Sequence, residues 1–184
     1  MDQRSNSSLS LFLMELIVAI MFFSLSAAVC VRLFASAHIL SDDTKSLSYA
    51  SIWTQNLAEA FEGKKGHLAG VAELYPDALI SYNTSDPKTS DGSIVLFFDD
   101  NWERVNNLVD ASYLASLTIT TKEASEVYWD VTDYDVALIG KAAEGDIAII
   151  DIRNIENLSP DIHVDPKNII MNVKVDTYLG KGAD

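Results

Sequence analysis

The apolar positions of this chain begin as one unbroken run from Ser10 to Arg32, in which Glu15 is the single charge before the closing arginine. At about 1.5 Å rise per residue, a helix of this length reaches roughly 30 Å, the thickness of a bilayer's hydrocarbon core. A chain inside lipid must satisfy its backbone hydrogen bonds internally, so this run is predicted to be helical. A carboxylate within a spanning helix is costly and calls for a partner, which singles out Glu15.

The helical pattern continues beyond the apolar run. Between Ser36 and Glu62, apolar residues recur at spacings of three, four and seven, which marks one face of a helix. The predicted packing stripe contains Leu40, Leu47, Leu57 and Phe61. Residues 1–62 hold no proline or glycine, and Gly63-Lys64-Lys65-Gly66 supplies a stop signal. We expect one helix of about 50 residues, roughly 75 Å long; a kink at Ser41-Asp42-Asp43 is the alternative.

The remainder of the chain has the alternation typical of β-strands. Six strands are predicted, at residues 78–82, 94–98, 114–121, 127–132, 147–152 and 169–178. The last is the clearest, because Ile169, Met171 and Val173 alternate with more polar neighbours. Residues 83–93 are a turn-rich connector that ends in Asp91-Gly92, typical of a hairpin or a longer loop. Residues 101–110 fit either a loop or a short helix.

One long helix followed by alternating strands predicts an α+β fold, with an antiparallel sheet packed on the second half of the helix. The corresponding divisions are 1–10, 11–34 (the membrane-spanning half of the helix), 35–62 (its amphipathic half) and 63–184 (a β-rich globular domain). About 150 residues remain outside the apolar run, which suits one compact domain.

Charge excludes one class of partner. The net formal charge is −14, from 13 Lys and Arg against 27 Asp and Glu, and the charges of residues 1–34 cancel. The acidic excess therefore lies in the outer domain, whereas nucleic-acid binding requires a basic surface. We expect a solvated acidic surface and no nucleic-acid partner.

The residues around Glu15 carry a family resemblance. The stretch Leu11-Phe12-Leu13-Met14-Glu15-Leu16-Ile17-Val18-Ala19-Ile20 resembles the amino terminus of type IV pilins and type II secretion pseudopilins. That family has a short polar leader, a peptidase cleavage point and a hydrophobic helix with glutamate at its fifth mature position. Counting back from Glu15 makes Leu11 the first mature residue and Ser10 the last leader residue. The resemblance covers about the first sixty residues.

The resemblance implies a pilin-like fold and a structural role. It implies a leader at residues 1–10, cleaved between Ser10 and Leu11 by a prepilin peptidase. The subunit would be stored in the bilayer with its amino terminus cytoplasmic and its domain outside. It would then assemble with other pilin-like subunits into a type IV pilus, type II secretion or competence-type filament. Glu15 would neutralise the new amino terminus at Leu11, of its own or a neighbouring subunit.

Other interpretations of the amino-terminal segment remain open. The family usually has glycine before the cut and a basic leader, whereas this chain has Ser10 and only Arg4 against Asp2. If these departures prevent cleavage, the chain is an uncleaved single-span anchor for an outer binding or sensing module. Glu15 is in that case an interfacial acid near water. A second alternative is a cleaved secretory signal, because Ala35-Ser36-Ala37 fits a signal-peptidase site. A third is a lipoprotein site at Cys30, because the residues before it faintly resemble a lipobox.

We find no catalytic motif in the sequence and expect no enzyme, no cofactor and no metal site. Two acidic runs, residues 99–100 and 130–135, carry oxygen ligands suited to calcium but do not match a calcium loop. The three histidines, His38, His67 and His163, lack ligand spacing. The three tryptophans, Trp53, Trp102 and Trp129, fit core packing better than a sugar-binding face.

Overall fold

A computed structural model of the chain describes residues 3–83, 91–129, 138–153, 155 and 166–181. The chain divides into two compact units, Met1–Lys45 and Ser46–Asp184. The predicted boundaries, after residues 34 and 62, differ from this division. The helix from Ser46 onward belongs to the same unit as the strands, because its apolar side chains are buried against them.

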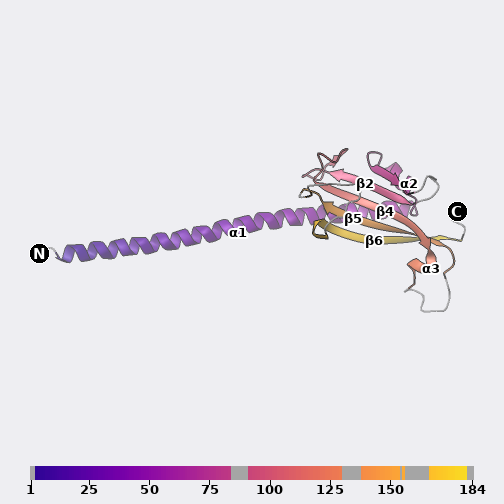
Figure 1. Cartoon of the computed structure of the whole chain (residues 1–184). Coiled ribbons are helices and arrows are strands. Elements are labelled where there is room, and N and C mark those ends of the chain that lie inside the picture. Colours follow the sequence, from indigo (N-terminus) through magenta and orange to yellow (C-terminus); the bar gives the residue numbers. More distant parts are fainter. Residues whose placement is uncertain (1–2, 84–90, 130–137, 154, 156–165, 182–184) are drawn as a thin grey trace. The chain divides into compact units, whose positions relative to one another are not determined.

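The first element, α1, is a continuous helix over Gln3–Gly63, 61 residues long (Figure 1). The prediction of one uninterrupted helix is confirmed, and residues 41–43 are helical like their neighbours. The helix is longer than expected because residues before the apolar run join it.

The helix ends in a Schellman motif. The N–H of Gly66 donates to the carbonyl oxygen of Phe61 (2.8 Å), and the N–H of Lys65 donates to that of Glu62 (3.0 Å). The left-handed residue just past the helix is Lys65, with φ of 52°, and Gly66 follows at 69°. The predicted stop is confirmed, although a lysine takes the position where glycine is commonest.

The strands form a six-stranded antiparallel sheet in the order β1-β2-β4-β5-β6, with β3 paired to the end of β2. The strands are β1 (Leu79–Tyr82), β2 (Gly92–Phe98), β3 (Arg104–Val105), β4 (Tyr113–Glu123), β5 (Lys141–Asp151) and β6 (Ile169–Gly180). The minor helices are α2 (Leu68–Leu74), α3 (Ala124–Val127) and a 3₁₀ turn, Pro166–Asn168. The α+β class and the antiparallel sheet are thus confirmed.

Five of the six predicted strands match observed strands, while the strand predicted at 127–132 is wrong in its described part. β4 ends at Glu123, and the helical turn α3 follows, closed by the Tyr128 N–H donating to the Ala124 carbonyl oxygen (3.0 Å). Trp129 is 76% exposed, so the apolar alternation there faces no core. Residues 101–110 form turns around β3 rather than a helix. The predicted connector at 83–93 falls between the antiparallel neighbours β1 and β2; residues 84–90 of it lie outside the described residues, and β2 already begins at Gly92.

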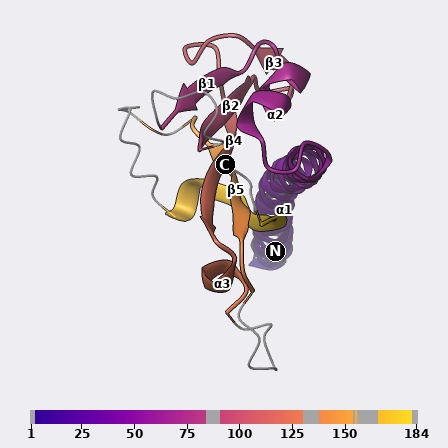
Figure 2. The same cartoon turned by 90° about the vertical axis from the view of Figure 1, so that its right-hand side faces the viewer.

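The main core lies between α1 and one face of the sheet (Figure 2). The buried helix positions follow a spacing of four, four, three and four. They are Ser46, Ala50, Thr54, Leu57 and Phe61, and Ala60 beside Phe61 is buried as well. These side chains meet alternate residues of the central strands, such as Leu96, Leu117 and Ile147, which are buried on the same side.

Half of the predicted packing stripe lies in this core. Leu57 and Phe61 are fully buried, whereas Leu47 is 51% exposed and Leu40 is 67% exposed. Leu47 follows the buried Ser46 and is turned about 100° from it around the helix axis, which takes it off the packed face. Leu40 precedes the sheet-bearing unit. For these two leucines the stripe prediction is wrong.

The opposite face of the sheet carries a second, smaller apolar cluster of Leu114, Ile150 and Ile152. Partly buried neighbours, including Phe97 and Ala111, surround it. This cluster explains why β5 has apolar residues at consecutive positions, Ile149 and Ile150, instead of a strict alternation.

Candidate functional site: the exposed apolar helix and a groove on the sheet

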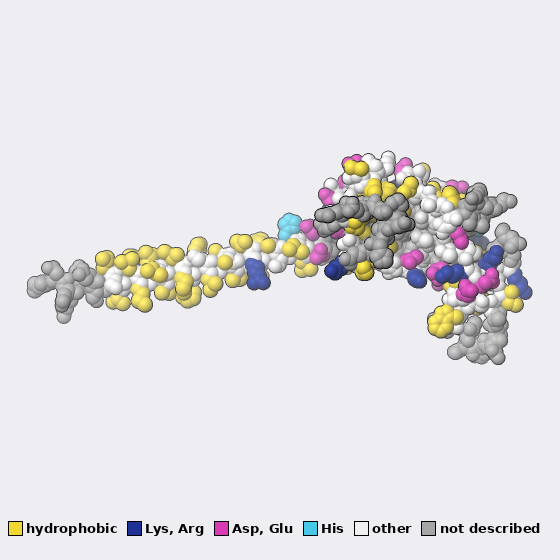
Figure 3. Space-filling view, in the orientation of Figure 1, with side chains coloured by type: hydrophobic (Ala, Val, Ile, Leu, Met, Phe, Trp, Pro, Cys, Tyr) yellow, Lys and Arg dark blue, Asp and Glu magenta, His cyan; other side chains and the backbone are white. Residues whose placement is uncertain are grey.

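The first candidate site is the exposed part of α1. Every residue from Leu9 to Lys45 is exposed, and hydrophobic side chains cover the surface of this helix (Figure 3). Within the described part of the chain, one helix, Leu9–Gly63, is long and apolar enough to cross a membrane. An apolar surface of this extent is unfavourable in water and requires lipid or another apolar partner.

The three residues tied to the family resemblance all lie on this exposed helix. Ser10 and Leu11 are helical on both sides of their shared peptide bond. Glu15 is exposed one turn later, and no ion pair joins it to another described side chain. The next charged residue toward the carboxyl end, Arg32, is about 25 Å further along the helix. Within one chain, Arg32 is therefore too far along the helix to pair with Glu15.

Other polar residues of this segment have local roles. The Ser24 hydroxyl donates to the carbonyl oxygen of Ile20 (2.8 Å), which satisfies it within the helix. His38 Nδ1 lies 3.5 Å from Asp42 Oδ2, one turn away. Cys30 is an exposed free thiol in the apolar surface.

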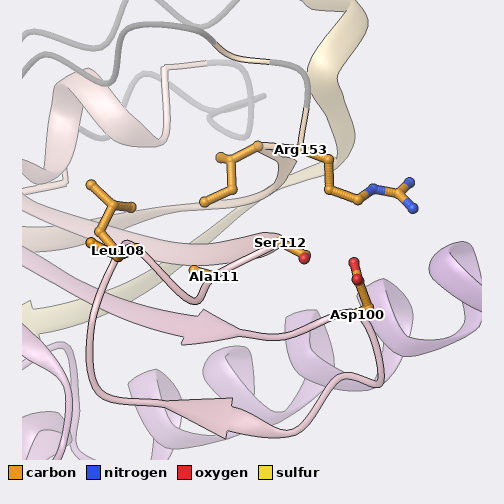
Figure 4. Close-up of a pocket in the computed structure, with 7 residues that line it drawn as sticks. Asp100, Leu108, Ala111, Ser112 and Arg153 are labelled. Atoms are coloured by element: carbon orange, nitrogen blue, oxygen red, sulfur yellow. The ribbon is translucent and has the colours of Figure 1, made fainter.

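The second candidate site is a groove of about 630 Å³ beside the second apolar cluster (Figure 4). Leu108, Val109, Ala111 and Ile152 supply its apolar lining, and Asp100, Ser112 and Arg153 supply its polar groups. Figure 4 shows the three polar groups together at one end of the groove and Leu108 at the other. Val109 is 94% exposed, so its side chain gains no burial from this position.

Arg153 is fixed at the groove by two neighbours. Its Nη2 lies 2.6 Å from Asp151 Oδ2, and its Nε donates to both oxygens of the same carboxylate (3.0 and 3.2 Å). The guanidinium carbon lies 4.8 Å from the centre of the Tyr113 ring. The hydrogen-bonded carboxylate raises the pKa of Arg153. Burial raises the pKa of Asp151, but the hydrogen bonds from Arg153 outweigh it and lower that pKa overall.

The groove combines apolar contact area with fixed hydrogen-bond donors and acceptors. The groove is nevertheless open to solvent, and the guanidinium of Arg153 is already paired with Asp151, so it lacks the enclosure typical of a small-molecule pocket. Within the described residues, no group of three or more His, Cys, Asp or Glu side chains is placed to hold a metal ion. The groove could not be predicted from the sequence, because its residues come from three separate segments; the spacing Asp151-x-Arg153 is the one local signal of it.

The remaining residues considered from sequence have structural roles or lie outside the described ranges. The Asp99 carboxylate accepts the backbone N–H groups of Asn101 (2.8 Å) and Glu103 (2.9 Å), which closes a turn. Trp53 and Trp102 belong to the main core, so they form no exposed sugar-binding face with Trp129. The acidic run 130–135 and residue 163 are not among the described residues.

Comparisons of the chain with protein-family models, with curated proteins and with solved structures find no match.

Proposed function

We propose that this protein is a structural, pilin-like subunit of a type IV pilus, type II secretion or competence-type filament. It would be stored in a membrane through the first half of α1 and assembled through the same helix. The prepilin peptidase and other pilin-like subunits would be its partners. Its role would be that of a minor pilin or pseudopilin.

One observation carries the proposal: a single helix is exposed and apolar over its first half and packs against the sheet of a folded domain over its second half. The apolar half bears one acid, Glu15, at the position that the pilin-like resemblance requires. A helix that only anchored a domain would gain nothing from an acid inside its apolar run. A helix that is later surrounded by copies of itself can pair that acid with a neighbour's amino terminus.

The proposed mechanism begins with removal of residues 1–10, which places a free amine at Leu11. In the low dielectric of a bundle of apolar helices, the Glu15 carboxylate and that amine would attract strongly, and either one alone would be costly to bury. This pairing would fix the axial register of each new subunit. Because the bond between Ser10 and Leu11 lies within α1, the peptidase would first have to unwind the helix locally.

The amino-terminal mass of the protein from its native membrane tests this proposal directly. A start at Leu11, with or without an added methyl group, is expected. Replacing Ser10 by glycine (Ser10→Gly) should raise the processed fraction, while Ser8→Gly, two residues before the bond, should leave it unchanged. A native start at Met1 or Asp2 would contradict the proposal.

The role of Glu15 is tested by assembly. Glu15→Gln keeps the size of the side chain and removes its charge, so membrane insertion should persist while incorporation into filaments is lost. The matched control is Glu62→Gln, which removes an exposed acid from the sheet-bearing part of the same helix. Normal filament incorporation by Glu15→Gln would show that the pairing is not required.

A second candidate is an uncleaved single-span anchor that holds the sheet domain outside the membrane as a binding module. Two observations favour it: serine stands where the family usually has glycine, and the groove beside Arg153 is an open surface of the outer domain. In that case the mature chain keeps residues 1–10, and Glu15→Gln has no effect beyond insertion. The same mass measurement therefore separates the two candidates.

A further inference from the structure

Trp102 occupies an unusual backbone conformation in the turn between β2 and β3. Its φ is 65°, in the left-handed region that bulky side chains avoid. The Trp102 N–H donates to the Asp99 carbonyl oxygen (3.0 Å), and the Asp99 N–H donates to that of Glu103 (3.0 Å). Glycine or asparagine is the usual residue at such a position in a hairpin. The side chain of Trp102 must therefore compensate for its backbone strain.

That side chain is inserted between α1 and the sheet. The Trp102 ring is stacked on Tyr49 of α1, with ring centres 5.5 Å apart, and on Tyr113 of β4, with ring centres 4.2 Å apart. Trp53 of α1 contacts Phe98 at 4.6 Å between ring centres. Together with the Ser46–Tyr113 hydrogen bond, these ring contacts hold the first turns of the packed helix on the sheet.

This contact region is less well satisfied than the rest of the core. Trp102 Nε1 and Thr54 Oγ1 are buried, and neither has a hydrogen-bond partner in the described structure. Both groups would gain a hydrogen bond to water if the helix left the sheet here, and the strained Trp102 backbone would relax. Among the described residues, these are the two buried side-chain polar atoms without a partner; further along α1, the fully buried Leu57 and Phe61 make purely apolar contacts with the core.

We propose that residues 46–54 of α1 and the turn 99–102 form a latch that opens locally while the rest of the sheet unit stays folded. Backbone strain and unpaired buried polar groups each destabilise the closed state, and both are relieved when the segment opens. Opening would extend the free part of α1 from Lys45 to about Thr54, which adds about 13 Å of helix. The latch thus sets how much of α1 is available to partners, whether or not the chain is a filament subunit.

Thiol labelling of the full chain in detergent micelles tests the latch. Cys30 is replaced by serine, and a single cysteine is placed at Ala50 (Ala50→Cys), inside the latch, or at Ala60 (Ala60→Cys), beyond it. Ala50 is fully buried and Ala60 is 7% exposed, so static exposure alone would label position 60 faster. The latch predicts the reverse: cysteine 50 should react at least about tenfold faster under native conditions.

A turn variant links this opening to Trp102. Asp99→Ala removes the carboxylate that closes the turn, so it should speed labelling at position 50 and leave position 60 unchanged. The control, Asp110→Ala, removes an acid that accepts a hydrogen bond from Asn107 in a nearby turn and should change neither rate. Equal labelling at positions 50 and 60, or equal acceleration of both by Asp99→Ala, would overturn the proposal.

Hydrogen exchange of the unmodified chain provides a second measurement in case a cysteine disturbs the core. A helical segment released from the sheet loses the packing that stabilises it and unfolds locally more often, so amides of residues 46–54 should exchange faster than those of residues 57–61. Identical exchange across both segments would show that the packed helix leaves the sheet only as one unit.

Discussion

The hydroxyl oxygens of Ser46 and Tyr113 lie 3.1 Å apart in a buried hydrogen bond. Ser46 is the first residue of the sheet-bearing unit, and Tyr113 is the first residue of β4. The bond therefore joins α1 to the sheet at the residue where the packed part of the helix begins. Two hydroxyl groups at one site satisfy each other, so neither is left without a partner in the core.

Removal of one partner of this bond should destabilise the sheet unit. Tyr113→Phe leaves the buried Ser46 hydroxyl unpaired, and we expect the free energy of unfolding to fall by about 1–2 kcal/mol. The double variant Ser46→Ala/Tyr113→Phe removes both polar groups and should recover part of that loss. Urea unfolding followed by tryptophan fluorescence measures the free energy of unfolding of the double variant and of each single variant. A loss in the double variant equal to the sum of the two single losses would contradict direct pairing.

Two positions of the predicted stripe, Phe61 and Leu47, differ in burial and should therefore differ in their contribution to stability. Phe61→Ala removes a fully buried ring from the core, and we expect a loss of about 3–5 kcal/mol in the free energy of unfolding. Leu47→Ala, at a position 51% exposed on the same helix, should cost less than about 0.5 kcal/mol. Comparable losses at the two positions in a denaturant titration would contradict the observed packing.

Gly145 allows α1 to approach the sheet closely. A Cβ atom at this position would lie 2.9 Å from Val175 Cγ2, and 3.1 Å from both Leu117 Cδ1 and Phe61 Cε2. We therefore expect Gly145→Ala to lower the free energy of unfolding by about 1–3 kcal/mol through overpacking. Gly63→Ala is the control, because a Cβ there meets no atom within 4 Å. Thermal unfolding measures both variants, and an unchanged stability of Gly145→Ala would show that the neighbouring side chains move aside at little cost.

Glu144 gives the sheet a defined response to acid. A hydrogen bond from Lys122 (3.1 Å) is the main cause that lowers the pKa of Glu144, against an opposing effect of burial, and Lys174 adds attraction at 3.6 Å. Because the folded-state pKa lies below the unfolded value of about 4.3, the stabilisation is complete above that value. It is lost as the pH falls through the folded-state pKa.

The expected stability difference between the native protein and Glu144→Gln is about 0.5–1 kcal/mol at neutral pH, because both lysines are partly exposed. It should vanish in acid below the folded-state pKa. Glu103→Gln, which replaces an exposed acid in the turn before β3, should show no such pH-dependent difference. Denaturant titrations at several pH values measure this, and a difference that persists in acid would exclude the ion pairs as its cause.

Patterns that act over a few neighbouring residues determined much of this fold. An unbroken apolar run and a stripe of period 3.6 determined the long helix, because helical hydrogen bonds join residues only four positions apart. The stop at 63–66 followed from its two glycines, although Lys65 takes a left-handed backbone angle together with Gly66. Five strands followed from alternation, and Glu15 stood out because a charge inside an apolar run is visible in the sequence itself.

The tertiary structure decided which side chains those elements bury. Whether Leu47 or Ser46 faces the sheet depends on the rotation of α1 against strands that lie far later in the chain, such as β4 and β5. The alternation at 127–132 could not be distinguished from a strand, because only the absence of a facing core at Trp129 shows otherwise. Trp102 lies in a left-handed turn that its own sequence disfavours, because stacking on Tyr49 and Tyr113 outweighs the local preference. Contacts between distant segments carry no signal in a single sequence, so packing alone determined them.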